Sequence, residues 1–115
     1  MQEEIRVWLK DIENAISEIN DFLPRPKNFR AFEKDLKTRR AVERNIEIIG
    51  EAMGRILRVN PQIVISDSRK IVDTRNRIIH GYDSVSNDVI WLIAIKYLPI
   101  LAEEVKALLK EDEKR

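Results

Sequence analysis

Two long stretches of this sequence repeat apolar residues every three or four positions, and they restrict its fold more than any other feature. One stretch spans residues 3–23 and the other residues 37–58. This spacing gathers side chains on one side of an α-helix, whereas on a strand it would scatter them over both faces. The stripes are Ile5, Trp8, Leu9, Ile12, Ala15, Ile16, Ile19 and Leu23 in the first stretch, and Val42, Ile46, Ile49, Ala52, Met53, Ile56 and Leu57 in the second. The pattern predicts two long amphipathic helices.

Breaks in the pattern separate these helices from their neighbours. Pro24 ends the first helix. Residues 27–36 form a connector with one helical turn, and we expect Phe29 and Phe32 to fasten it to the helices. Residues 59–67, which contain a proline after an asparagine, end the second long helix.

Two more helices are expected in the rest of the chain. The third spans residues 67–80, with Ser66 or Asp67 as its N-cap and Gly81 as its stop. The last helical stretch spans residues 84–112. We expect Pro99 to break or kink it, because proline lacks the backbone N–H that a helix interior requires.

Residues 89–95 are apolar on all sides of the last helix, which favours burial on more than one side. A chain of 115 residues has a small interior, so a second subunit is the simplest cover for the remaining face. Three glycines and four prolines are too few for an all-β protein. We therefore predict an all-α fold: one domain over residues 1–115, an antiparallel bundle of four to five helices, and a dimer.

The composition excludes several kinds of site. The absence of cysteine removes disulfides and thiolate zinc sites, and it fits a reducing cytoplasm, where we expect the protein. The first residues are acidic and helical in pattern, so no signal peptide is expected. The most apolar run, residues 89–95, is far shorter than the roughly 20 residues that span a bilayer. No membrane segment, cofactor or metal is expected.

The charges are unevenly distributed along the chain. Residues 25–58 carry ten lysines and arginines against five acidic residues, whereas both ends of the chain are acidic. A basic middle can attract phosphates. The alternative is a set of ordinary solvated helix faces.

Three residues of the second long helix do not fit a simple apolar stripe. Asn45 lies inside the stripe, where a buried amide needs partners, and it either fixes helix register or bonds to a site residue. Gly50 and Gly54 each cost roughly 1 kcal/mol of helix stability relative to alanine. We expect the close approach of another helix to compensate for this cost.

Arg75 falls in the middle of the apolar side of the third helix, one turn from Ile71 and Ile79. Val72 and Ile78 complete that side. An arginine there is costly unless it is paired or lies at a hydrated seam. Either it bridges to an acidic residue such as Glu47 or Glu51, or it lines a cleft at a subunit interface and binds an anion.

His80, the only histidine, lies near the C-terminus of the same helix, where the helix dipole favours the imidazolium. This position suits proton transfer rather than metal binding. RNA cleavage by 2′-hydroxyl attack needs both a base and an acid, which one histidine cannot be at once, although a two-fold dimer can bring two together. Since Arg75 and His80 lie about 140° apart on the helix, a shared site would depend on the helix end and the second subunit.

Residues 75–80 (RNRIIH) match the R-(polar)-x-x-x-H signature of the HEPN ribonuclease superfamily. With residues 81–82 (GY) the motif becomes R-x4-H-x-Y, which resembles the HepT toxin branch. Residues 44–52 (RNIEIIGEA) look like the second-helix signature of those proteins, and Trp91 followed by Leu98-Pro99 looks like their last helices. The resemblance covers nearly the whole chain.

The resemblance implies an all-helical dimer that cleaves RNA without metal in a cleft holding the motifs of both subunits. It makes Arg75 and His80 catalytic, Asn76 the residue that orients them, and Tyr82 the acceptor of AMP. The AMP would come from a small nucleotidyltransferase antitoxin similar to MntA, and transfer would neutralise the toxin. AMP on Tyr82 would add bulk and negative charge two residues from His80.

Two other interpretations of the motif remain open at this point. In one, the dimer is a non-catalytic subunit that binds a nucleotide or a partner within a nucleotidyltransferase complex, and Arg75 and His80 hold phosphate. In the other, the motif is a satisfied helix end, which an Arg75 salt bridge inside one subunit would support.

Overall fold

The computed structural model describes residues 1–23, 25–80 and 85–114, and the predicted helix stop Gly81 and the modification acceptor Tyr82 lie outside these ranges. The described residues contain no strand. The elements are α1 (Glu3–Phe22), α2 (Phe29–Lys34), α3 (Leu36–Val59), α4 (Ser68–His80), α5 (Asn87–Leu92), the π-helix η1 (Ile93–Tyr97) and α6 (Leu98–Glu113). The all-α prediction is confirmed, and the ends of the first three long helices lie within one residue of the expected positions.

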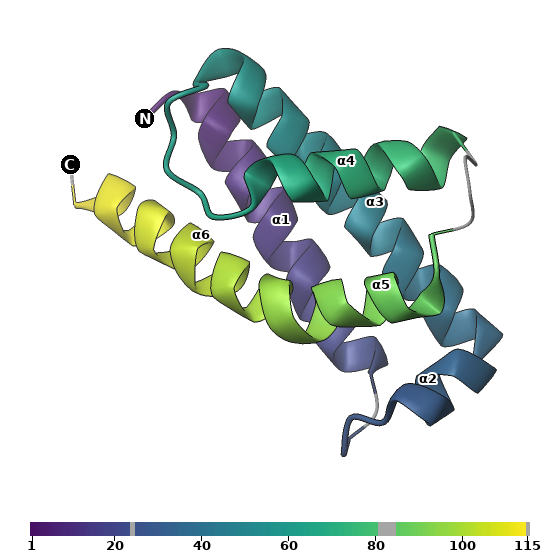
Figure 1. Ribbon diagram of the computed structural model, residues 1–115. Coiled ribbons are helices and arrows are strands. Elements are labelled where there is room, and N and C mark those ends of the chain that lie inside the picture. The colour runs from purple at the N-terminus through teal and green to yellow at the C-terminus, as the bar shows by residue number, and fades with distance from the viewer. Residues whose placement is uncertain (24, 81–84, 115) are drawn as a thin grey trace.

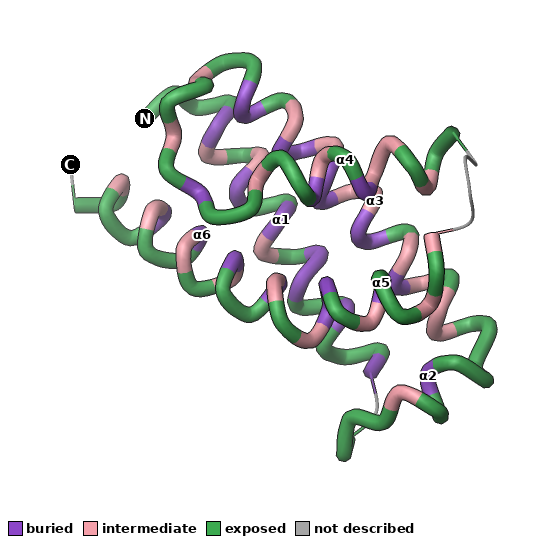
Figure 2. The backbone as a smooth tube through the Cα atoms, in the orientation of Figure 1, coloured by how far each residue is buried: buried purple, intermediate pink, exposed green. Residues whose placement is uncertain are grey.

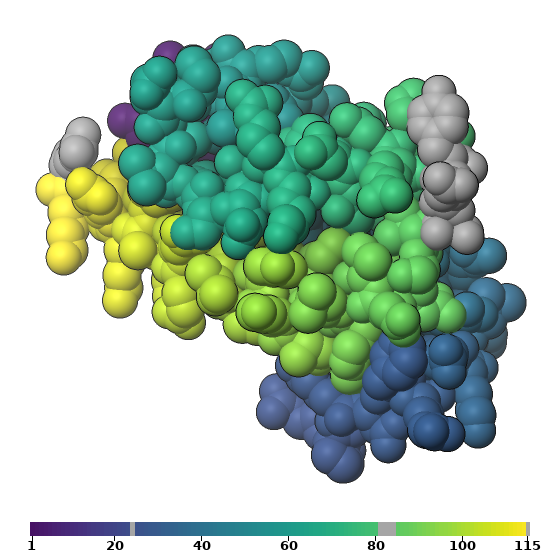
Figure 3. Space-filling model, in the orientation of Figure 1, coloured from purple at the N-terminus to yellow at the C-terminus, as the bar shows by residue number. Residues whose placement is uncertain are grey.

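The long helices form a bundle around α3. In Figure 1, α1 and α3 run side by side in opposite directions, α4 crosses α3, and α6 returns along α1, so both termini lie at one end of the molecule. The ion pair between Arg6 and Asp112 joins α1 to α6 at that end, with a distance of 2.9 Å between Nη1 and Oδ2. Figure 3 shows that the side chains of α4 meet those of the α5–α6 segment, closing the space between the two ribbons.

The core follows the predicted stripes. Figure 2 shows that burial is confined to the inward side of each long helix. Leu9 and Ile12 of α1, Ile49 and Met53 of α3 and Val105 of α6 are fully enclosed. Burying apolar side chains of this size supplies most of the free energy that holds such a bundle together.

The connector α2 is fastened to the bundle by aromatic residues, as predicted. Asn28 caps it, because its Oδ1 accepts a hydrogen bond from the Ala31 backbone N–H at 3.1 Å. Phe32 is buried, and its ring centroid lies 5.2 Å from that of Trp91 and 6.5 Å from that of Phe29. The Phe29 and Trp91 rings meet edge to face at 5.8 Å. These three rings join α2 to α5.

We expected Pro99 either to break or to kink the last helix, and the break is absent. Helix α6 starts at Leu98 and runs through Pro99, and the irregular geometry lies just before it, in η1. Proline cannot donate to the carbonyl four residues earlier, and its ring crowds that carbonyl. The wider π-helical turns of η1 accommodate the proline, so the helical path from α5 to α6 continues without a gap.

The apolar segment 89–95 is buried on one side only within this chain. Ile90, Ile93 and Ala94 face the core, whereas Val89 is 38% exposed and Leu92 is 45% exposed. The chain alone therefore leaves an apolar strip on α5 uncovered. None of the described helices is both long and apolar enough to cross a membrane.

The start of α4 is held by its neighbours rather than by the side-chain cap that we expected. The hydroxyl of Ser66, one of the two cap candidates, donates instead to Glu104 Oε2 at 2.9 Å, which ties the preceding loop to α6. Asp67, the other candidate, directly precedes the helix with a φ of 55°. Its backbone carbonyl accepts from the Ile71 N–H at 3.2 Å. The first of these contacts ties the start of α4 to α6.

Candidate functional site

Helices α3 and α4 cross in close contact at Gly50. A Cβ at Gly50 would overlap the Arg75 Cβ, and it would lie 2.9 Å from the Arg75 Cγ and 3.1 Å from the Ile71 carbonyl oxygen. The expected close approach of another helix is therefore confirmed at Gly50. It is absent at Gly54, where a Cβ would meet only Val72 Cγ2, at 4.0 Å. Since Gly50 contacts the root of the Arg75 side chain, it helps to set the position of that arginine.

The Arg75 side chain is half-buried at this crossing, and its neighbour Asn76 holds it. Arg75 Nη1 donates to Asn76 Oδ1 at 3.1 Å. Arg75 Nε is fully buried and has no hydrogen-bond partner. A buried guanidinium N–H without an acceptor is costly, so this arginine is incompletely satisfied within one chain.

The two carboxylates that could have neutralised Arg75 have other partners. Glu47 binds Arg44, with a distance of 3.0 Å between Oε2 and Nη1, and Glu51 binds Arg55, with a distance of 2.9 Å between Oε1 and Nη2. Among the described residues, no carboxylate lies within salt-bridge distance of Arg75. The reading of the motif as a helix end satisfied by an internal salt bridge therefore loses its support.

Arg75 and Asn76 line a groove of about 260 Å³ between α3 and α4. Three arginines and two glycines contribute to its surface, and Val72 is the one large apolar side chain. The lining residues are Gly50, Glu51, Gly54, Arg55, Arg58, Val72, Arg75 and Asn76. The excess of guanidinium groups makes this groove suited to an anion.

His80 lies outside that groove. It is exposed at the end of α4, one residue after Ile79, which is 46% exposed although we expected it on the apolar side. Thr74 is buried instead, and its hydroxyl donates to the Lys70 carbonyl at 2.9 Å. Within one subunit the structure therefore brings together Arg75 and Asn76 but does not add His80, in agreement with their angular separation on the helix.

A basic and aromatic contact lies at the opposite end of α4 from His80. Lys70 Nζ donates to the Tyr97 hydroxyl at 3.1 Å and lies 4.6 Å from the centre of its ring. This hydrogen bond raises the pKa of Lys70 above its ordinary value. Lys96 Nζ lies 5.9 Å from the same ring. The contact joins the start of α4 to η1.

Two other buried polar groups of α3 lack a complete set of partners. Asn45 is buried, and its Nδ2 donates to the Ala41 carbonyl at 3.0 Å, whereas its Oδ1 has no partner among the described residues. Arg39 donates from Nη1 to Asn87 Oδ1 at 3.3 Å, and its Nε is buried without a partner. The Asn45 bond lies within α3, and the Arg39 bond ties α3 to the start of α5.

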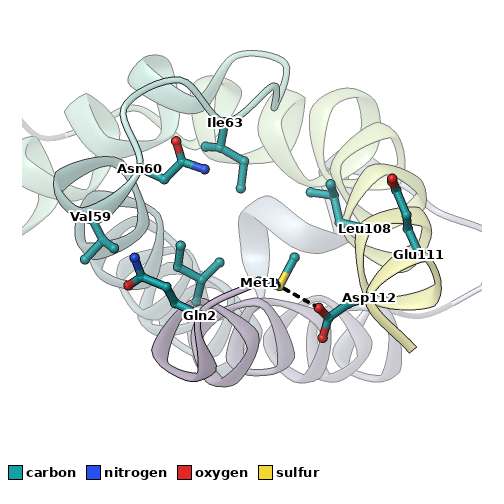
Figure 4. A pocket seen from close by; sticks show the side chains of 9 residues that line it. Met1, Gln2, Val59, Asn60, Ile63, Leu108, Glu111 and Asp112 are labelled. Carbon is teal, nitrogen blue, oxygen red and sulfur yellow. Dashed lines mark ion pairs between the residues drawn. The ribbon is translucent and has the colours of Figure 1, made fainter. Parts of the chain in front are cut away.

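A larger hollow, of about 650 Å³, lies away from the motif, at the end of the bundle where the termini meet (Figure 4). The start of α1, the end of α3 and the end of α6 surround it. The Met1 amine and Asp112 Oδ1 pair at its edge, 3.4 Å apart. In the described part of the chain, no three histidine, aspartate or glutamate side chains come together as a metal site would require.

Arg55 and Arg58 were not singled out by the sequence analysis. The signals were present in the basic composition of residues 25–58 and in Gly54. On α3 alone both arginines look like ordinary exposed residues, and only the crossing of α4 makes them part of the wall of a groove.

Comparison with known proteins identifies the family. The family model "Ribonuclease HepT-like" matches residues 12–108. A "Putative RNase" of Methanocaldococcus jannaschii is 30% identical over 97% of this chain and 93% of its own length. "Probable ribonuclease HepT" of Thermococcus cleftensis is 34% identical over 96% of this chain and all of its own length.

A third relative, a "Putative RNase" of Caldanaerobacter subterraneus, is 30% identical over 89% of this chain and 94% of its own length. No solved structure matches the chain significantly. The family assignment rests on a match over most of the chain and agrees with the resemblance carried by residues 75–82 and 44–52. The chain therefore belongs to the HepT-like ribonuclease family.

Proposed function

We propose that this protein is a metal-independent endoribonuclease toxin whose active site combines Arg75 and His80 from two subunits. The observation that carries the proposal is the state of Arg75. In a chain of a ribonuclease family, this half-buried guanidinium lines a basic groove, is held by Asn76, and is not neutralised by Glu47 or Glu51. Such a group is suited to hold a phosphate and to stabilise the charge that develops on it.

The proposed homodimer supplies two histidines to one site, so that one can act as the base and the other as the acid. The exposed apolar side chains Ile79, Val89 and Leu92 lie close in sequence to His80, on the two helices that flank residues 81–84. Covering them with a second copy would bury apolar surface and bring a second His80 near the first. Asn76 orients Arg75 from within the same helix.

Cleavage in this site needs only proton transfer and charge stabilisation. His80 of one subunit accepts the proton of the ribose 2′-hydroxyl, whose oxygen then attacks the adjacent phosphorus. The bond from phosphorus to the 5′-oxygen breaks, and His80 of the other subunit donates a proton to that oxygen. Arg75 holds the non-bridging oxygens throughout. The products are a 2′,3′-cyclic phosphate and a free 5′-hydroxyl.

Replacing Arg75 tests the proposal directly. We expect Arg75→Ala to reduce cleavage of RNA by the purified protein about 10²-fold, because an oriented donor to the developing charge is lost. Growth inhibition on expression should disappear with it. Arg40→Ala removes the same type of side chain from an exposed ion pair on α3, the one with Glu43, and should retain full activity. Equal cleavage by wild type and Arg75→Ala would refute the assignment of Arg75.

The proposed antitoxin is a small nucleotidyltransferase that transfers AMP to Tyr82. Transfer would place a bulky anion two residues from His80, where it would exclude the RNA phosphate. We expect intact-mass measurement to show added AMP after incubation with this enzyme and ATP, and no addition in Tyr82→Phe. Addition to Tyr82→Phe would show that the acceptor lies elsewhere. A tight complex without any RNA cleavage by the unmodified protein would instead favour a non-catalytic binding subunit.

A further inference from the structure

The packing of the described residues does not explain Gly54. A glycine inside a helix costs roughly 1 kcal/mol relative to alanine. At Gly50 the contact with α4 accounts for that cost, but at Gly54 the nearest non-local atom to a Cβ would be Val72 Cγ2, 4.0 Å away. An alanine would therefore fit there. The missing side chain leaves open space in the surface of the groove that also contains Arg75.

Arg55 and Arg58 extend the positive charge of this groove away from Arg75. Both are exposed, and Arg55 makes only the exposed ion pair with Glu51, which contributes little to stability. Arg58 makes no ion pair or side-chain hydrogen bond with the rest of the described chain. The groove thus carries three arginines against one glutamate. Guanidinium groups bind phosphate oxygens through paired hydrogen bonds.

Arg75 and Arg58 lie at different levels along the axis of α3. Arg75 contacts α3 at Gly50, and Arg58 follows Gly50 by eight residues, which corresponds to about 12 Å along the helix. Gly54 lies midway between these two levels and presents bare backbone. A chain of linked phosphates could lie over Gly54 with Arg75 at one end and Arg58 at the other.

We propose that the groove over Gly54 is an extended RNA subsite in which Arg55 and Arg58 bind backbone phosphates next to the one held by Arg75. The inference rests on the proposed ribonuclease function and adds the residues that position the flanking part of the substrate. Gly54 is glycine because a side chain there would obstruct the RNA backbone. The subsite recognises the charge and shape of the RNA backbone, so it contributes to affinity without selecting a particular nucleobase.

A second copy of this chain fits the groove less well. Val72 is the one large apolar side chain of the lining, whereas subunit interfaces have apolar centres. A two-fold interface buries the same patch on both subunits, so an interface centred on this groove would bring together the three arginines and one glutamate of each copy. Like charges brought together in this way repel each other.

RNA binding without cleavage tests the subsite separately from the chemistry. Binding of a labelled single-stranded RNA would be measured by fluorescence anisotropy in a His80→Ala background, over a range of salt concentrations. We expect Arg58→Gln to weaken binding about tenfold, as the loss of a hydrogen bond to a charged group predicts. The slope of log Kd against log salt should fall by about 0.7, the value for one phosphate on a single strand. Arg40→Gln, which changes an exposed arginine of α3 outside the groove, should change neither value.

Gly54→Leu tests the open space without changing any charge. We expect it to weaken RNA binding at least as much as Arg58→Gln while keeping the fold, because leucine is a better helix former than glycine and a Cβ at this position would meet only Val72 Cγ2, at 4.0 Å. Wild-type affinity and salt slope in both variants would overturn the subsite. A change of oligomeric state in Gly54→Leu with unchanged RNA binding would assign the groove to a second copy and would also overturn it. Failure of the ribonuclease proposal is distinguishable, because it appears as the absence of His80-dependent cleavage in the wild-type protein.

Discussion

His80→Ala is expected to cleave RNA about 10³-fold more slowly than the wild-type protein and to inactivate wild-type subunits with which it assembles. Loss of a positioned proton-transfer group typically costs 10²–10⁴-fold in rate. His80 is exposed at the end of α4 and outside the core, so its loss should leave the fold intact. Cleavage of a labelled RNA under single-turnover conditions measures the effect.

Mixing the two proteins shows whether one site uses histidines from two subunits. If each site needs both copies of His80, a mixed dimer is inactive, and activity falls with the square of the wild-type fraction. If one chain holds a complete site, activity falls in proportion to that fraction. The wild-type and His80→Ala chains would be co-expressed with different tags, so that mixed dimers form. The two homodimers and the mixed dimer would then be separated by their tags. Full activity per wild-type chain in the mixed dimer would contradict the shared site.

The helices of this chain could be predicted because they depend on local spacing. The stripes of α1 and α3 and the proline after each helix specify both the elements and their ends. The absence of a break at Pro99 has a tertiary cause. The rule that proline ends a helix considers one hydrogen bond, whereas here Ile93 and Ala94 are buried in the core and hold the segment in helical turns that widen around the proline.

The site could be predicted only in part, for a similar reason. The position of Arg75 within an apolar stripe shows that it is unusual, but its spacing permits a bridge to Glu47 or Glu51 as readily as an open groove. That choice depends on the partners that Arg44 and Arg55 take on the surface of α3. Likewise, the two glycines of α3 look equivalent in the sequence, and only the crossing angle of α4 makes one a contact and the other an opening.

Helix α2 has one buried residue, the aromatic Phe32. Phe32 is 1% exposed, and it contacts both Phe29 of its own helix and Trp91 of α5. Helix α2 has only six residues, so it cannot be stable alone, and its tertiary contacts determine its position. Asp35, which follows α2 directly, is the N-cap of α3. Its Oδ1 accepts a hydrogen bond from the Thr38 N–H at 3.1 Å.

Phe32→Ala is therefore expected to lower the free energy of unfolding by about 4 kcal/mol, since the cost combines lost burial with the cavity left beside Trp91. Phe22→Ala removes the same ring from a position that is 39% exposed and should cost less than about 1 kcal/mol. Urea unfolding of both variants at one chain concentration measures the difference and holds any contribution from dimerisation constant. Equal midpoints for the two variants would show that α2 is not anchored through Phe32, and the link from α2 to α5 would then have to rest on Phe29.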